Sequence, residues 1–132
     1  MAEVNGAQYL QFPFAVTDEG PVHDSRTGHI RGQIEQVLFT NPRERVFRPE
    51  FGVGVRRLVF EPNNLILRNT VVKRLNYSLA RALYGEVDPR TLKVEVKNEA
   101  ETLSIHISYT LAALNKAEAY TFRVGPAGGS NG

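Results

Sequence analysis

The hydrophobic period of the sequence changes at the Asp88-Pro89-Arg90 turn, and this change constrains the fold more than any other feature. Before the turn, apolar residues recur at every fourth position from Leu67 to Leu83, the spacing of one face of an amphipathic helix. After the turn, apolar and polar residues alternate, as in strands that bury one face. This order predicts an α+β domain in which a long helix covers the apolar face of an antiparallel sheet.

The long helix is predicted over residues 64–84. Asn63 or Asn64 can cap its start, and Gly85 is suited to end it. Its buried stripe is expected to consist of Leu67, Val71, Leu75, Leu79 and Leu83.

Three alternating segments, at residues 92–97, 103–111 and 120–124, predict a small antiparallel meander. Such a sheet has two edges, whose unpaired amide and carbonyl groups could receive an extended peptide from another protein. The alternative is that the amino-terminal arm or the carboxy-terminal tail covers these edges within the same chain. The sequence leaves both possibilities open.

Another helix is predicted near residues 28–40, where apolar residues again lie on one face. Thr27 is its expected cap, and Asn41-Pro42 is expected to close it. The residues of the apolar face are Ile30, Ile34, Val37 and Leu38.

The two ends of the chain show no sustained period. Residues 1–27 are expected to form an extended arm anchored by Phe12 and Phe14, and residues 126–132, rich in glycine, a flexible tail. At 132 residues the chain has the size of one domain, which we place at residues 1–125.

Residues 42–62 are predicted to be irregular, because prolines and glycines interrupt them. The segment is nevertheless strongly apolar, so it should either pack against the domain or form a surface that another protein covers. Five arginines crowd this region although the net charge is only +2. Their planar forks suit a protein interface, but a solvated basic face fits the composition equally well.

Composition narrows the functional classes. The chain contains no cysteine, so it has no disulfide, thiolate metal site or cysteine nucleophile. No apolar run approaches the roughly 20 residues of a membrane helix, and the first residues do not resemble a secretory signal. We therefore expect folding in the cytoplasm and no membrane partner.

The sequence contains no strong catalytic motif. The histidines, His23, His29 and His106, lack a metal-binding spacing, and neither a phosphate loop nor a nucleophile elbow is present, so no metal or cofactor is expected. A lysozyme-like hydrolase remains an alternative because such an enzyme needs only two carboxylates. The candidates are Glu35, Glu44, Glu50, Glu61 and Asp88, although Glu44 and Glu50 lie among arginines and not in an apolar pocket. A nucleic-acid-binding module is a further alternative, with no recognition motif to support it.

The run LFTNPRER from Leu38 to Arg45, followed by RPEFG from Arg48 to Gly52 and by LVFEP ending at Pro62, resembles the baseplate wedge family of contractile tails. That family includes the wedge protein of T-even-like phages, the W-type protein of P2-like phages, the TssE-type subunit of type VI secretion and a subunit of extracellular contractile injection systems. The last branch is the most similar. Two positions depart from the family's pattern: Arg43 replaces a usual glycine, and Asp88 replaces a common glutamate.

The resemblance implies a structural subunit and not an enzyme. The Asp88-Pro89-Arg90 turn would contact the helical core bundle of the larger wedge proteins, and the sheet edge would receive extended arms of the first sheath ring. The partners that it implies are larger wedge proteins, sheath protein and tube or spike-hub proteins. The subunit itself would be present in several copies around a ring, six by analogy with the family. No nucleic-acid partner is expected.

The residues expected to contact partners fall into four groups. They are Asp88, Pro89 and Arg90 of the turn; Arg43, Arg45, Arg48, Arg56 and Arg57 of the basic segment; Tyr120 and Phe122 of the last strand; and the loop motif Pro49, Glu50, Phe51 and Gly52. For Asp88 and Arg90, a salt bridge within the domain is an equally good interpretation. For the loop motif, packing under the long helix is the favoured one.

Overall fold

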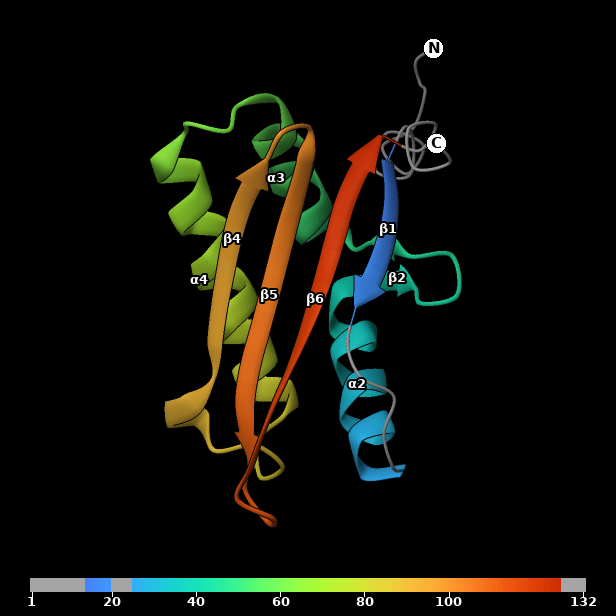
Figure 1. Ribbon diagram of the computed structural model, residues 1–132, viewed down its shortest axis with the longest axis vertical. Helices are drawn as coiled ribbons and strands as arrows, with labels where there is room; N and C mark the ends of the chain where they lie inside the picture. The colour runs from blue at the N-terminus through green and yellow to red at the C-terminus, as the bar shows by residue number, and fades with distance from the viewer. Residues whose placement is uncertain (1–13, 20–24, 127–132) are drawn as a thin grey trace.

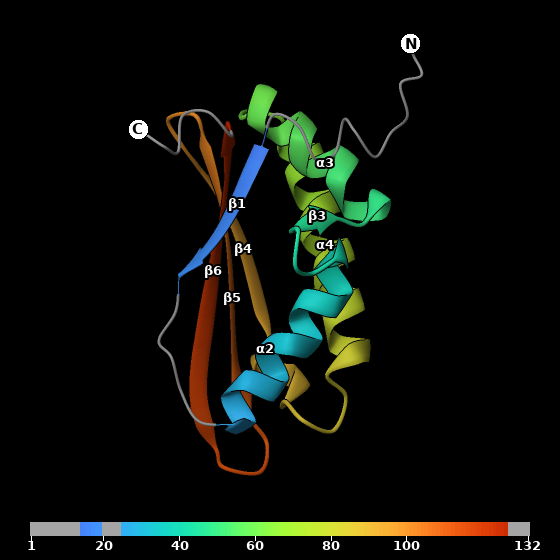
Figure 2. The same ribbon diagram turned by 90° about the vertical axis from the view of Figure 1, so that its right-hand side faces the viewer.

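The computed structural model describes residues 14–19 and 25–126, and the side chains of residues 29–125. It has two layers: a four-stranded antiparallel sheet of order β1-β6-β5-β4, and helices that cover one face of that sheet (Figures 1 and 2). The α+β prediction is therefore confirmed. In chain order the elements are β1 (Phe14–Glu19), α2 (Ser25–Leu38), β2 (Phe39–Asn41), β3 (Val46–Phe47), α3 (Pro49–Phe60), α4 (Leu65–Ala82), the short 3-10 helix η1 (Pro89–Thr91), β4 (Lys93–Glu99), β5 (Thr102–Leu111) and β6 (Lys116–Pro126).

Helix α4 spans Leu65–Ala82, which lies within the predicted range of residues 64–84. The Asn64 side chain caps it by accepting a hydrogen bond from the Leu67 amide at 3.0 Å. Gly85 follows the helix with φ +87°, a conformation that favours glycine. Val71, Leu75 and Leu79 are buried, so the stripe with a four-residue repeat faces the core.

Strands β4, β5 and β6 form the predicted meander. One residue of each connecting turn lies in the left-handed region: Ala100 between β4 and β5, and Asn115 between β5 and β6. The amino-terminal arm adds a fourth strand, because β1 pairs with β6 from Phe14↔Pro126 to Glu19↔Thr121. The edge of β6 is thus covered by the same chain. Backbone pairing needs little side-chain pattern, so the arm carried no clear strand signature.

The prediction of an irregular segment at residues 42–62 is wrong for most of its length, since Pro49–Phe60 forms helix α3. Pro49 occupies the first turn, where a missing N–H costs nothing. Phe51, Val55 and Leu58 lie on one face of the helix and are buried. The loop motif is therefore the first turn of a helix.

One glycine explains how α3 approaches α4 closely. A Cβ built on Gly54 would lie 2.7 Å from Val71 Cγ2, so only glycine fits there without movement of the neighbouring helix. The glycine that suggests a loop in the sequence is a packing residue in the structure.

A shared core lies between the helices and the sheet. Ile30, Ile34 and Leu38 of α2 join it, and the aromatic ring of Phe39 packs on Phe47 and Phe122 with centroid distances of 5.0 and 5.9 Å. Helix α2 begins at Ser25, so Thr27 lies inside it and is not its cap. In the part of the chain that the structure describes, no helix has the length and apolar character needed to cross a membrane.

Candidate docking surfaces

The Asp88-Pro89-Arg90 turn forms the start of η1. The Asp88 carboxylate accepts a hydrogen bond from the Arg90 amide at 3.0 Å, and Arg90 Nη2 lies 3.3 Å from Asp88 Oδ2. Hydrogen bonds from the Arg90 side chain and amide lower the pKa of Asp88 below its usual value. The isolated chain therefore contains the salt bridge within the domain, between Asp88 and Arg90, that was the alternative interpretation.

This turn is held rigidly against β5. The Asp88 amide donates to the Thr110 carbonyl at 3.0 Å, Thr91 Oγ1 donates to the Asp88 carbonyl at 2.6 Å, and the Thr110 amide donates to Thr91 Oγ1 at 2.9 Å. The Arg90 side chain is 89% exposed. The turn thus presents a pre-oriented, charged tip to solvent.

Three of the five arginines lie at the corner formed by α2, β2 and β3. Arg45 Nη1 lies 2.9 Å from Glu35 Oε2, and its guanidinium sits 5.7 Å from the centre of the Phe39 ring. Arg48 Nε donates to the Gln36 carbonyl at 3.0 Å, whereas Arg43 is an exposed residue of the turn. Arg45 and Arg48 therefore attach this corner to α2.

The other two arginines lie in the second half of α3. Arg57 pairs with Glu61 at 3.2 Å, and Arg56 stacks on Phe60 with its guanidinium 5.4 Å from the ring centre. These residues are eight or nine positions after Arg48, about 12 Å along the helix axis. The basic segment is consequently divided between two elements.

The β4 edge of the sheet is partly covered. Because a two-residue turn joins β4 to β5, Glu99 and Thr102 form the hydrogen-bonded pair that closes the hairpin. Hydrogen-bonded pairs alternate with non-bonded pairs, so the backbone groups that point away from β5 belong to Val94, Val96 and Asn98.

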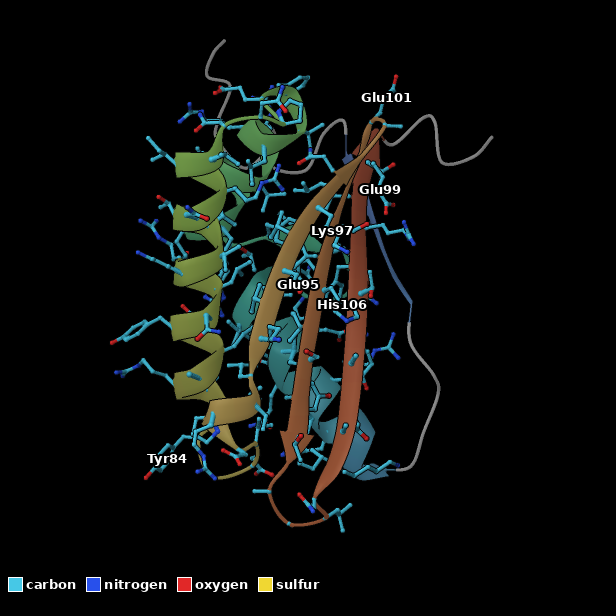
Figure 3. All side chains as sticks on the ribbon, turned by 60° about the vertical axis from the view of Figure 1, so that its left-hand side comes forward. Tyr84, Glu95, Lys97, Glu99, Glu101 and His106 are labelled. Carbon is cyan, nitrogen blue, oxygen red and sulfur yellow. The ribbon has the colours of Figure 1, made fainter. Side chains whose placement is uncertain are left out.

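Arg68 of α4 covers the upper part of this edge. Its Nη1 donates to the Val96 carbonyl at 2.7 Å, and its Nη2 bonds the Asn98 side chain. The side-chain Nδ2 of Asn98 in turn donates to the Leu58 carbonyl at 3.2 Å. On the face of β4 and β5 away from the helices, charged and polar side chains such as Glu95, Lys97 and His106 alternate with the buried ones (Figure 3).

The opposite edge belongs to β1. The alternation of hydrogen-bonded and non-bonded pairs continues through β5 and β6 to β1. The backbone N–H and C=O groups of Phe14, Val16 and Asp18 therefore point away from β6. Among the described residues, no strand pairs with β1 on that side. Within the described part of the chain, β1 is therefore the edge strand on this side of the sheet.

Two predicted contact residues on β6 are core residues. Tyr120 is 2% exposed and Phe122 is fully buried, so in the isolated chain their side chains face the core and not the surface. Their inward position follows from the alternation of the strand, whose apolar face packs under the helices. In the loop motif, Phe51 and Gly52 are buried, as the favoured interpretation requires, and Pro49 and Glu50 are exposed.

Large apolar side chains also lie exposed outside the predicted site. The stripe of α4 follows positions 67, 71, 75, 79 and 83, and several apolar residues off that stripe face solvent. Counting off-stripe residues in the sequence would have found them. The exposed ones on α4 and just after it include Ile66, Tyr77 and Tyr84, the last projecting from the lower end of the helix (Figure 3).

Three of the five carboxylates considered for hydrolysis, Glu35, Glu61 and Asp88, pair with arginines in the structure. Hydrogen bonds from Asn64 and Arg57 lower the pKa of Glu61, and Glu35 pairs with Arg31 and Arg45. A general acid needs the opposite shift. Among the described residues, no three histidine or acidic side chains are grouped as metal ligands would be.

His29 lies 3.8 Å from Glu86, and His106 Nδ1 contacts Thr121 Oγ1 at 2.7 Å. These contacts join a helix to a turn and one strand to the next. His23 lies outside the described residues.

Comparisons with known proteins identify the family of this chain. Residues 24–116 match the family described as baseplate wedge protein gp25, which covers more than half of the chain. Neither the curated proteins nor the solved structures give a match. The matched range runs from α2 through the Asp88-Pro89-Arg90 turn to the start of β6, so this chain belongs to the gp25 family of baseplate wedge proteins.

Proposed function

We propose that this subunit joins the baseplate wedge to the first ring of sheath and starts sheath assembly by accepting extended arms as added strands. The observation that carries the proposal is the sheet order β1-β6-β5-β4, in which an arm already adds as an edge strand. A sheet that receives one arm from its own chain has the geometry to receive another from a neighbour.

The acceptor edge in this proposal is β1. The β4 edge has the Val96 carbonyl occupied by Arg68, and the charged residues along β4 discourage further pairing. On β1, the outward groups of Phe14, Val16 and Asp18 offer a short ladder. Backbone pairing of this kind gives affinity with few demands on the partner's sequence.

The Asp88-Pro89-Arg90 turn is proposed as the contact with the larger wedge proteins. Asp88 is held by the backbone and side chain of Arg90, and Arg90 is almost fully exposed. Arg90 can therefore form a charge-assisted bond with a partner carboxylate while the turn stays folded. Tube or spike-hub proteins are further possible neighbours, and ring assembly in six copies in the cytoplasm is the family's expectation.

The subunit acts in this account by assembly and not by catalysis. The lowered pKa values of Glu61 and Asp88 support this, because neither carboxyl would hold a proton to donate near neutral pH. Membership of a structural family gives the same indication.

Proline substitution on β1 tests the proposal. Val16→Pro removes an outward N–H while leaving the hydrogen-bonded pairs of β1 with β6 intact, so we expect baseplates that bind the subunit but carry no sheath. Val16→Ala shortens the same side chain and keeps the N–H, so it is the matched control. Normal sheath growth on Val16→Pro baseplates would exclude β1 as the acceptor.

A further inference from the structure

A groove of about 860 Å³ lies on the helical layer, apart from the turn and the strand edges. Its walls are the faces of α2 and α4 that do not carry the buried stripes, and the first turn of α3 closes one end. Gly32 and Gln36 of α2, and Tyr77, Ser78 and Arg81 of α4, are among the lining residues.

The shape of the groove fits a helix. On α2 the lining positions 29, 32, 33 and 36 follow the i, i+3, i+4, i+7 spacing, and on α4 positions 77, 78 and 81 share one face. These walls are about two turns, roughly 11 Å, long. Gly32 and Ser78 keep the space between them open, and a Cβ on Gly32 would meet no atom within 4 Å. The side chains of a third helix could therefore settle between α2 and α4.

The charge of the groove specifies the chemistry of that helix. Helix α4 contains four basic residues and no acidic one. Arg48 and Arg81 line the groove, and Glu50 is the single acidic residue that does so. Arg81 is held over the Tyr77 ring, 5.6 Å from its centre, and Tyr77 is 64% exposed. An exposed aromatic ring beside arginines is typical of the residues that dominate protein interfaces.

We propose that the groove binds an acidic amphipathic helix of another baseplate protein, with its apolar face against Tyr77 and carboxylates on Arg48 and Arg81. A second copy of this chain is a poor occupant. Helix α2 carries one acidic residue, Glu35, which is already paired with arginines, α3 carries only Glu50, and α4 carries none.

Single cysteine substitutions test whether a partner occupies the groove, because the chain contains no cysteine of its own. Ser78→Cys places a thiol in the groove, and Asn69→Cys places one on an exposed part of α4 outside it. Assembly should slow the reaction of the first thiol with a maleimide about tenfold or more, since interface cores exclude solvent, and should leave the second within about twofold. Equal rates for Ser78→Cys in the free chain and in assembled particles would overturn the proposal.

A larger side chain in the groove should reduce binding of a partner without destabilising the fold. Gly32→Gln puts a good helix former where there is space, so the Tm should rise while incorporation into baseplates falls about tenfold or more. Arg81→Glu should lower incorporation, whereas Lys73→Glu makes the same charge change on α4 outside the groove and should not. Normal incorporation of Gly32→Gln would contradict the proposal.

A photo-crosslinking residue at position 78 identifies the occupant. An acidic helical segment of another baseplate protein supports the proposal, and a crosslink to nucleic acid or to a second copy of this chain overturns it. This result is independent of sheath templating. Val16→Pro should abolish sheath growth without changing the groove, so the two proposals can fail separately.

Discussion

Two helical glycines should respond in opposite directions to the same substitution. Gly32 of α2 and Gly54 of α3 both lie inside helices, where alanine is favoured over glycine by about 1 kcal/mol. An added Cβ meets nothing within 4 Å at Gly32, but it lies 2.7 Å from Val71 Cγ2 at Gly54. The environment of each glycine therefore decides the sign of the effect.

Gly32→Ala should stabilise the chain by about 1 kcal/mol, which raises the Tm by about 3–5 °C for a domain of this size. At Gly54, overpacking against a stiff, buried valine costs about 2 kcal/mol. The gain in helix propensity offsets about half of this cost. Gly54→Ala should therefore destabilise the chain by about 1 kcal/mol and lower the Tm by about 3–5 °C.

Urea and thermal unfolding of the purified variants, followed by circular dichroism, measure both changes. In a Val71→Ala background the clash disappears, so Gly54→Ala should become stabilising by about 1 kcal/mol. The coupling between the two substitutions would then be about 2 kcal/mol. If Gly54→Ala has the same effect in both backgrounds, the close contact between α3 and α4 is not its cause.

Other substitutions test the cap of α4 and the Asp88-Pro89-Arg90 turn. Asn64→Ala removes the cap of α4 and should cost about 1 kcal/mol in urea unfolding, and Asn64→Asp should restore most of it. Arg90 lowers the pKa of Asp88 in the folded chain. The pair therefore stabilises the fold at pH values above the ordinary pKa of aspartate, and this stabilisation is lost as the pH falls through the lowered pKa of Asp88. Carboxyl NMR should find the Asp88 pKa higher in Arg90→Ala than in the parent chain, and an unchanged pKa would refute the pairing. Replacing both Asp88 and Arg90 with alanine should reduce binding to the wedge core, and unchanged baseplate assembly would remove the turn from that interface.

The sequence predicts the carboxy-terminal half of the fold well because its signals agree with one another. The four-residue repeat, the Asn64 cap and Gly85 all indicate α4, and strict alternation indicates β4, β5 and β6. Local propensity, pattern and turn chemistry point to the same structure there.

Two elements were not predicted from the sequence, for different physical reasons. Helix α3 has a usable signal, with Pro49 at its start and Phe51, Val55 and Leu58 on one face, but Gly54 counts against a helix until its contact with Val71 is seen. Strand β1 has little signal, because edge pairing to β6 is made by backbone atoms.

Only part of the candidate site can be predicted from the sequence. The Asp88-Pro89-Arg90 turn can be located, because proline and its neighbours define a local structure. The arginines are adjacent in sequence, yet the structure divides them between a corner and a helix, which depends on the unpredicted α3. The groove could not be predicted, since it requires the relative placement of α2 and α4.

The central claim is that the chain serves as a scaffold that a sheath needs in order to begin. Electron microscopy of particles from a strain lacking this chain, with and without the wild-type copy restored, tests it most directly. The account predicts tubes or baseplates without attached sheath in the deletion strain, and sheathed particles after restoration. Intact, contractile particles formed in the absence of the chain would contradict it.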